Sequence, residues 1–270
     1  LTDHLIDTCE SRADAMAIID LAKDYVPPHE NTSTETTNRP DPIGAVNTLK
    51  GRQINSSYAA AYYPFVQIRD TEADRLVYVP PSVVALGTLG SSERARDVWF
   101  APAGFTRGGL SNGAAGIPVT GVKLQLSSEE RDDLYSANVN PIASFPAEGI
   151  VVFGQKTLQV IPSALDRINV RRLLLLIKKR VSKIAATTLF EQNVQETWNN
   201  FSGQVETLLA NIKGGQGLTD FKVILDETTT TPELIDRNIL YAKIFLKPAQ
   251  AIEFIALDFV ITDSGASFAD

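Results

Sequence analysis

The stretch DRINVRRLLLLIKKRVSKIAATTLF, residues 166–190, decides the fold class of this chain. Its apolar residues recur every three or four positions, a spacing that places them on one face of a helix. A second stretch with the same spacing, residues 194–213, follows and ends at Gly214 and Gly215, which is typical of a helix C-terminus. The pattern therefore predicts two long amphipathic helices in succession. In the first helix we expect the buried face to consist of Val170, Leu173, Leu174, Ile177, Val181 and Ile184.

Shorter segments on both sides of this helix pair predict the rest of the fold. Runs rich in Val, Ile, Tyr and Phe predict strands, and Ser127 ahead of two glutamates predicts the start of a helix. Pro64 cannot donate a ladder hydrogen bond, so its strand should lie at a sheet edge or carry a bulge. Strands interspersed with helices predict an α/β fold in which a mixed sheet is flanked by helices. The expected strands are 16–21, 58–69 paired with 75–79 as a hairpin, 141–145, 149–153, 221–225, 240–246 and 252–261, and the further helices are 3–13, 80–96 and 128–136.

Two segments in the N-terminal half are expected to be loops. Residues 27–42 are polar and contain several Pro and Thr, which is typical of a flexible surface loop. Residues 104–121 are rich in glycine, which is typical of a mobile or tightly turning loop. We expect the chain to divide into an N-terminal part, residues 1–119, and a C-terminal domain with a terminal strand, residues 120–270.

The composition argues against several classes of protein. The chain has 270 residues, a net charge of -7, one cysteine and two histidines. A single cysteine excludes an internal disulfide and a Cys-rich zinc site, and it points to a reducing compartment. An acidic chain is a poor general binder of nucleic acid, and no run approaches the ~18 apolar residues of a membrane helix. Because the chain opens on Leu1 with an acidic segment and no signal peptide, we expect a truncated or processed chain.

No motif indicates catalysis. Residues 149–157 resemble a phosphate-binding loop, but Gln155 adds one residue to the required spacing, and the intervening Ile-Val-Val-Phe predicts a strand. His4 and His29 lie near the terminus and in the polar loop, so a Ser-His-Asp site would depend on a mobile group. We therefore expect no catalytic residue, no metal site and no cofactor.

A basic segment leaves two interpretations open. Seven basic residues and no acidic residue lie between Arg167 and Lys183, and on a helix they fall on the flank opposite the apolar face. They form either a solvated helix face or a docking surface for an acidic partner. The best local cluster consists of Lys178, Lys179, Arg180 and Lys183.

Five groups of short motifs follow one another at compatible spacing. They are SFPA and GQKTL within residues 140–158, DRINVRRL at 166–173, LFE at 189–191, DFKVILDET at 220–228, and KPA with EFI within 247–255. In this order they resemble the C-terminal conserved region of the contractile tail sheath proteins of myovirus-type bacteriophages, most of all the T4-like branch. From residue 55 onward, NSSYAAAYYPFVQIRD, VPPS and RDVWFAPAG resemble the upstream part of the same region.

The resemblance implies a structural role. Subunits of this family stack as hexameric rings in a helical sheath around the tail tube, and contraction drives the tube through the host envelope. The implied partners are further copies of the chain, the tail tube protein, and the baseplate and tail terminator proteins, with no direct nucleic acid and no membrane. The implied location is the virion tail after assembly in the host cytoplasm. The alternative is a phage- or plasmid-encoded hydrolase with its site in the loop 104–121.

The resemblance also directs attention to the C-terminal strand. Residues 252–261 carry large apolar groups on both faces, whereas a half-solvated strand would have one polar face. This strand is therefore expected to insert either into the subunit's own core or into a neighbour's sheet. Because sheath subunits of this family are linked by strand exchange, the implied subunit interface consists of Phe254, Ile255, Leu257, Phe259 and Ile261. Because they grip an acidic tube, the resemblance implies that Lys178, Lys179, Arg180 and Lys183 form a tube-facing basic strip, with the helix 194–213 as the alternative tube-facing element.

Overall fold

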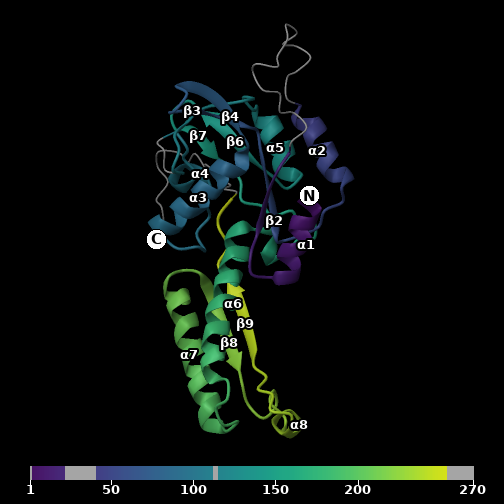
Figure 1. The fold of residues 1–270 in the computed structure, drawn as a ribbon, viewed down its shortest axis with the longest axis vertical. Coiled ribbons are helices and arrows are strands. Elements are labelled where there is room, and N and C mark those ends of the chain that lie inside the picture. The colour runs from purple at the N-terminus through teal and green to yellow at the C-terminus, as the bar shows by residue number, and fades with distance from the viewer. Residues whose placement is uncertain (1, 22–40, 112–114, 254–270) are drawn as a thin grey trace, which may run out of the picture.

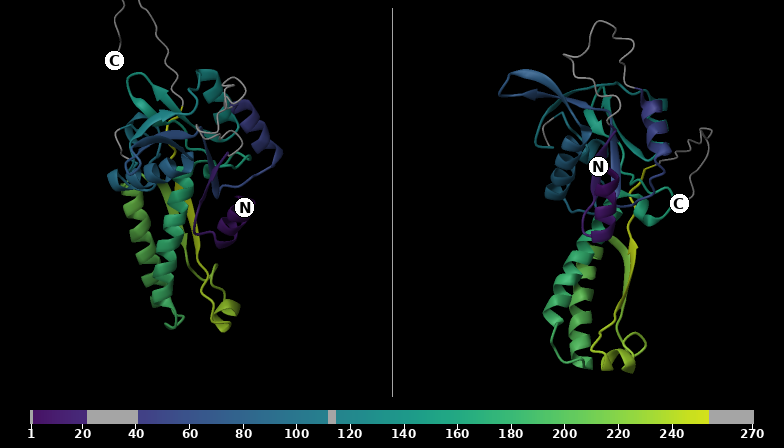
Figure 2. Two further views of the ribbon diagram at one scale, coloured as in Figure 1. Left: turned by 45° about the horizontal axis from the view of Figure 1, so that its top comes forward. Right: turned by 45° about the vertical axis from the view of Figure 1, so that its right-hand side comes forward.

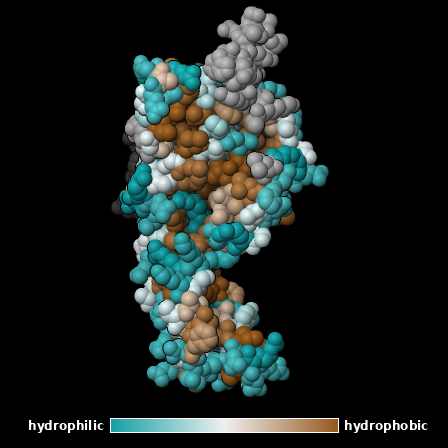
Figure 3. Space-filling view, in the orientation of Figure 1, coloured by the Kyte–Doolittle hydropathy of each residue, from teal (hydrophilic) through white to brown (hydrophobic). Residues whose placement is uncertain are grey.

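The structure of the chain is a computed structural model that describes residues 2–21, 41–111 and 115–253. Two parts follow one another along its longest axis: an upper part, which we call the head, and an elongated lower part, which we call the lobe (Figure 1). A narrow waist separates them in the space-filling view, where hydrophobic surface gathers over the head and the free end of the lobe is mostly hydrophilic (Figure 3).

The head comprises the described residues 2–21, 41–111 and 115–167 and a returning segment, 249–253. Its helices and short strands alternate along the chain, which confirms the predicted mixed α/β class. In chain order the head contains α1 (Thr2–Arg12), β1 (Ala17–Asp20), α2 (Pro42–Gly51), β2 (Ala59–Tyr63), β3 (Val66–Asp70), β4 (Arg75–Val79), α3 (Pro81–Ala95), α4 (Gly104–Arg107), β5 (Val119–Val122), α5 (Ser128–Ser136), β6 (Val139–Phe145), β7 (Gly149–Val152) and a 3-10 turn (Ala164–Asp166).

A four-stranded sheet in the order β1-β2-β6-β7 forms the centre of the head. β1 pairs with β2 and β2 with β6 in parallel, while β6 and β7 are antiparallel. Alternate residues of the buried strand β2 enter two cores: Ala59, Ala61 and Tyr63 pack with α1, α2 and α5, and Ala60 and Tyr62 pack with α3. This sheet joins strands from both sides of residue 120, and the division of the chain at that residue stays a prediction.

The predicted strand 58–69 is wrong as a single strand, because the chain changes sheets at Pro64. β2 ends at Tyr63 in the central sheet, and β3 starts at Val66 in a second, antiparallel sheet of order β4-β3-β5. Proline has no backbone N–H and cannot donate a ladder hydrogen bond, which favours a break between the two strands at this position. Only the second half of the predicted strand therefore forms the hairpin with 75–79.

Side-chain caps fix two helix starts in the head. In α5 the Ser127 hydroxyl accepts a hydrogen bond from the Glu130 amide at 3.2 Å, and the Glu130 carboxylate accepts one from the Ser127 amide at 2.8 Å, a capping box at the predicted position. In α2 the Asp41 carboxylate accepts from the Ile43 amide at 3.0 Å, with Pro42 in the first turn. The sequence analysis missed α2; the remainder of the polar loop, 27–40, lies outside the described residues.

The lobe, residues 168–248, packs two long helices against a two-stranded sheet (Figure 2). Leu173 and Ile177 of the first helix meet Val205 and Leu209 of the second, with Leu218 at the start of the sheet. Both helices lie where the spacing predicts them. The elements are α6 (Ile168–Thr188), α7 (Gln195–Gly214), β8 (Leu218–Ile224), α8 (Pro232–Asp236) and β9 (Lys243–Pro248).

The buried face of α6 is narrower than the sequence predicts. Leu173 is buried, but Leu174 is only partly buried, so the prediction that Leu174 is buried is wrong. Arg171, about one helical turn before Leu174, is buried. Its guanidinium lies 4.0 Å from the centre of the Tyr58 ring. A helix that leaves the head for the lobe changes partners along its length, so one straight apolar stripe does not describe it.

Candidate assembly site

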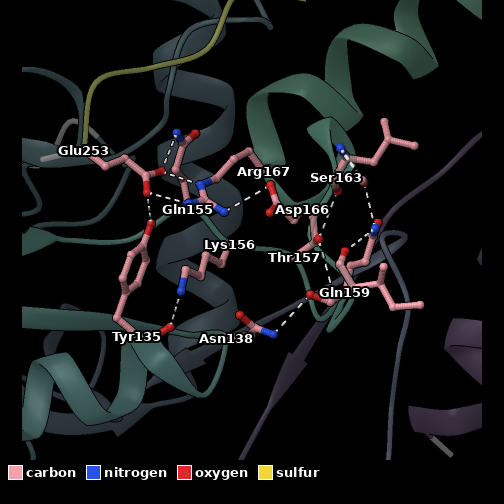
Figure 4. Close-up of polar contacts among 12 residues, drawn as sticks. Tyr135, Asn138, Gln155, Lys156, Thr157, Gln159, Ser163, Asp166, Arg167 and Glu253 are labelled. Atoms are coloured by element: carbon pink, nitrogen blue, oxygen red, sulfur yellow. Dashed lines mark hydrogen bonds and ion pairs between the residues drawn. The ribbon is translucent and has the colours of Figure 1, made fainter.

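One ion pair joins the two places where the chain crosses between head and lobe. Arg167 directly precedes α6, and Glu253 follows β9 by five residues. The Arg167 guanidinium donates to the two Glu253 carboxylate oxygens, from Nε at 2.7 Å and from Nη2 at 2.8 Å (Figure 4). Such a two-point pair fixes direction as well as distance. The outgoing and returning segments are therefore held together at the waist.

Two more donors complete the environment of Glu253. The Tyr135 hydroxyl donates to its carboxylate at 2.7 Å, and the Gln155 side-chain amide donates at 3.2 Å (Figure 4). Burial by itself would raise the pKa of Glu253, but the hydrogen bonds from Arg167 and Tyr135 outweigh it and hold the pKa below its ordinary value. Burial, together with the hydrogen bond to Glu253, raises the pKa of Tyr135, which stays a neutral donor. We call these four residues the clasp.

The clasp fixes the point from which the C-terminal segment leaves. The predicted interface residues Phe254, Ile255, Leu257, Phe259 and Ile261 lie outside the described residues, and of the predicted strand 252–261 only Ile252 and Glu253 are described, without strand structure. Glu253, the residue directly before them, is held in the clasp by Arg167. The sequence analysis missed the clasp, since Arg167 and Glu253 are 86 residues apart and no local pattern links them.

Trp99 makes a second connection between head and lobe. Its indole Nε1 donates to the Gly215 carbonyl at 2.7 Å, and its own carbonyl accepts from the Asn169 side chain at 3.1 Å. A Cβ on Gly217 would lie 2.9 Å from the indole ring, so glycine is required for this close approach. The end of α7 is thereby held against the head.

The basic segment of α6 serves two purposes. Arg167 lies in the clasp, Arg171 is buried and donates to the Ser57 hydroxyl, and Arg172 pairs with Glu93 at 2.9 Å. The predicted seven-residue strip is therefore shortened at its N-terminal end. Its four remaining residues are exposed, and Lys178 Nζ donates to the Ala13 carbonyl at 3.4 Å; they are Lys178, Lys179, Arg180 and Lys183.

The lobe sheet has open edges. β8 and β9 pair with each other from Leu218 to Ile224, and within the described residues neither strand has a second strand partner. Its inner face packs on the helices, while its outer face carries Phe245, which is 54% exposed. Unpaired strand edges are templates for an added strand.

Within the described residues, neither a metal-binding cluster nor a membrane-spanning helix is present. Across residues 2–21, 41–111 and 115–253, no group of three or more His, Cys, Asp or Glu side chains is placed to hold a metal ion. In the same ranges, no helix has the length and apolar character that crossing a bilayer requires.

Comparison with solved structures defines the fold. A chain of the sheath complex of an extracellular contractile injection system, PVC, in its contracted state superposes with a TM-score of 0.72 at 24% identity, covering 91% of this chain and 63% of that one. A chain of the contracted helical sheath of the anti-feeding prophage superposes with a TM-score of 0.71 at 23% identity, covering 95% and 64%. The fold is therefore that of contractile-sheath components.

Sequence relatives narrow the class to a family. Residues 161–262 match the phage tail sheath C-terminal domain. The tail sheath protein of Vibrio phage KVP40 is 35% identical over 230 residues, covering 85% of this chain and 33% of the relative, and that of Enterobacteria phage T4 is 33% identical over 215 residues, covering 80% and 32%. The chain belongs to the phage tail sheath family. It spans about a third of the length of these two relatives.

Proposed function

We propose that this chain is a structural subunit of a contractile tail sheath. It polymerises as hexameric rings stacked around a tail tube, and contraction of the sheath drives the tube through the host envelope. The observation that carries the proposal is a two-stranded sheet whose edges are unpaired within the described residues, in a chain of the sheath family whose apolar C-terminal segment follows directly on the clasp residue Glu253. Its partners are further copies of the chain, the tube protein, and the baseplate and terminator proteins of a virion tail assembled in the host cytoplasm.

The linking element is the segment 254–261. Its apolar residues on both faces suit a strand covered from both sides, and the open edges of β8 and β9 in a neighbouring subunit can accept it by backbone pairing. The interface residues of this strand exchange are Phe254, Ile255, Leu257, Phe259 and Ile261.

Deleting residues 254–270 tests this function while leaving the clasp in place. The chain is expressed with whatever flanking residues its gene encodes. We expect the shortened protein to stay folded but to form no rings or tubes in negative-stain electron microscopy, because the linking strand is missing. Tubes formed by the shortened protein would exclude the linking role. Unfolding caused by the deletion would place the segment in the subunit's own core.

The exposed basic strip is proposed to face the tube. Reversing charge in Lys179→Glu/Lys183→Glu should weaken binding to tube protein on the order of tenfold at low salt, since each exposed ion pair contributes ~0.2–1 kcal/mol and reversal adds repulsion. The difference should shrink at ~0.5 M salt. Lys222→Glu/Lys247→Glu, on the outer face of the lobe sheet, is the matched control. Unchanged binding of the strip variant at low salt would favour α7 as the tube-facing element.

The proposal excludes catalysis as the role of the chain. The hydrolase alternative receives no support from the relatives named above, which are tail sheath proteins. The described part of its supposed site, residues 104–111 and 115–121, contributes α4 and the start of β5 to the head.

A further inference from the structure

A cleft of about 790 Å³ opens beside the clasp. Its walls are α5, the segment around α4, the end of β7 and the returning segment 249–253. Its lining is rich in aromatic side chains, among them Trp99, Phe100 and Phe153, and it includes the guanidinium groups of Arg107 and Arg131. A cleft of this size with mostly apolar walls is typical of a binding site.

An exposed aromatic cluster extends the cleft onto the surface. The ring of Phe153 lies 5.0 Å from that of Phe145 and 5.5 Å from that of Phe105, measured between centroids. Phe105 is 51% exposed and Phe153 is 41% exposed. Grouped aromatic rings left in water mark a surface that another chain segment covers. The covering segment must therefore be largely apolar.

Two buried acceptors indicate what else the covering segment provides. Gln155 and Asn169 line the cleft and are buried, and their side-chain oxygens, Oε1 and Oδ1, have no hydrogen-bond donor within the described residues. A buried acceptor without a donor is costly, so an occupant that reaches these oxygens is stabilised by donating hydrogen bonds to them. An extended backbone carries N–H groups at regular intervals.

We propose that, while the subunit is free, this cleft holds residues 254–261 of its own chain, and that assembly releases them. The release of this segment on assembly rests on the proposed function as a sheath subunit, whereas its docking in the cleft does not. The segment begins at Glu253 in the cleft wall, so its local concentration at the cleft is high. It combines Phe254 and Phe259, which suit the aromatic lining, with the acidic Asp258 and no basic residue; the cleft offers Arg107 and Arg131 to this acid and also contains Asp132.

The docking explains how a strand with two apolar faces stays soluble before it meets a neighbour. An exposed segment of this composition is an aggregation hazard. The same eight residues cannot lie in the cleft and in a neighbour's sheet at once. Occupation of the cleft therefore delays polymerisation until a neighbour offers a better partner.

Hydrogen–deuterium exchange of the intact chain, kept monomeric by dilution and checked by size exclusion, tests the docking. We expect the amides of residues 254–261 to exchange at least tenfold more slowly than an unstructured peptide. Phe153→Ser should remove this protection. Phe190→Ser is the matched control: it changes a fully exposed phenylalanine at the end of the lobe and should leave the protection unchanged.

A peptide with the sequence of residues 254–261 provides a readout that needs no substitution. In excess, it should displace the tethered segment and speed exchange of its amides. Monomers whose residues 254–261 exchange at the unstructured rate would overturn the inference, and so would protection insensitive to both the peptide and Phe153→Ser. If the chain forms tubes but residues 254–261 are not protected in the monomer, the docking is refuted and the proposed function stands. If residues 254–261 are protected but the chain never polymerises, the proposed function is refuted and the docking stands.

Discussion

Leu173→Ala is expected to lower the free energy of unfolding by about 2–5 kcal/mol, and Leu174→Ala by less than half as much. Leu173 is 2% exposed in the lobe core and would leave a cavity, whereas Leu174 already contacts water and its site can fill with solvent. Urea unfolding can be followed by the fluorescence of the two tryptophans, Trp198 in α7 and Trp99 at the waist, which reports on the lobe and its junction with the head.

Leu173→Ala and Leu174→Ala control for each other, because both replace leucine by alanine in the same helix and change helix propensity equally. Equal losses for the two variants would show that Leu174 belongs to the core as fully as Leu173. A loss of stability that tryptophan fluorescence reports but probes in the head do not would show that the lobe unfolds as a separate unit.

Glu253→Ala should cost about 2–3 kcal/mol, toward the lower end of the range for breaking a buried ion pair, because the Arg167 and Glu253 side chains remain 25% and 15% exposed. The substitution leaves the Arg167 guanidinium and the Tyr135 hydroxyl without their shared acceptor. Asp14→Ala, which breaks the exposed pair with Arg12, is the matched control and should leave the stability nearly unchanged. Equal costs for Glu253→Ala and Asp14→Ala would show that the clasp does not stabilise the waist.

The pH dependence of the clasp follows from the lowered pKa of Glu253. A carboxyl group whose pKa is lower in the folded protein contributes stability that is complete above its ordinary pKa of 4.5 and is lost as the pH falls through the folded value. The stability difference between the intact protein and Glu253→Gln should therefore be constant from pH 6 to 8 and shrink below about pH 4.5. A difference that disappears between pH 6 and 8 would contradict the lowered pKa.

Local patterns predicted the elements whose signals are local. The period of α6 and α7, the serine cap of α5 and the glycines after α7 are written in neighbouring residues, and the structure has all of them. The cap signal of Asp41 and Pro42 was also available, but the polar residues before it hid the start of α2. The change of sheet at Pro64 depends on which strands lie beside it, which sequence spacing does not reveal.

The candidate site was harder to predict, because its parts are distant in the sequence. Glu253 is one acid among 32, and nothing near it indicates Arg167, Tyr135 or Gln155 as partners. The basic run of α6 was visible, yet only packing shows that Arg171 is buried and that the C-terminal four residues stay exposed. The sequence thus identified the basic segment of α6, but only tertiary contacts show which of its side chains are buried and which stay exposed.

The direction of the lobe sheet has a mechanical consequence. β8 and β9 run along the long axis of the lobe, and their ladder hydrogen bonds lie across that axis (Figures 1 and 2). A pull along the axis loads these bonds in shear, so the force is shared among all the pairs from Leu218–Pro248 to Ile224–Lys243, whereas a sideways pull would open them one at a time. A strand added to either edge shares the same geometry. If the lobe accepts a neighbour's strand as proposed, tension between the two subunits would pass along the ladder to the waist, where the Arg167–Glu253 pair would transfer part of it to the head.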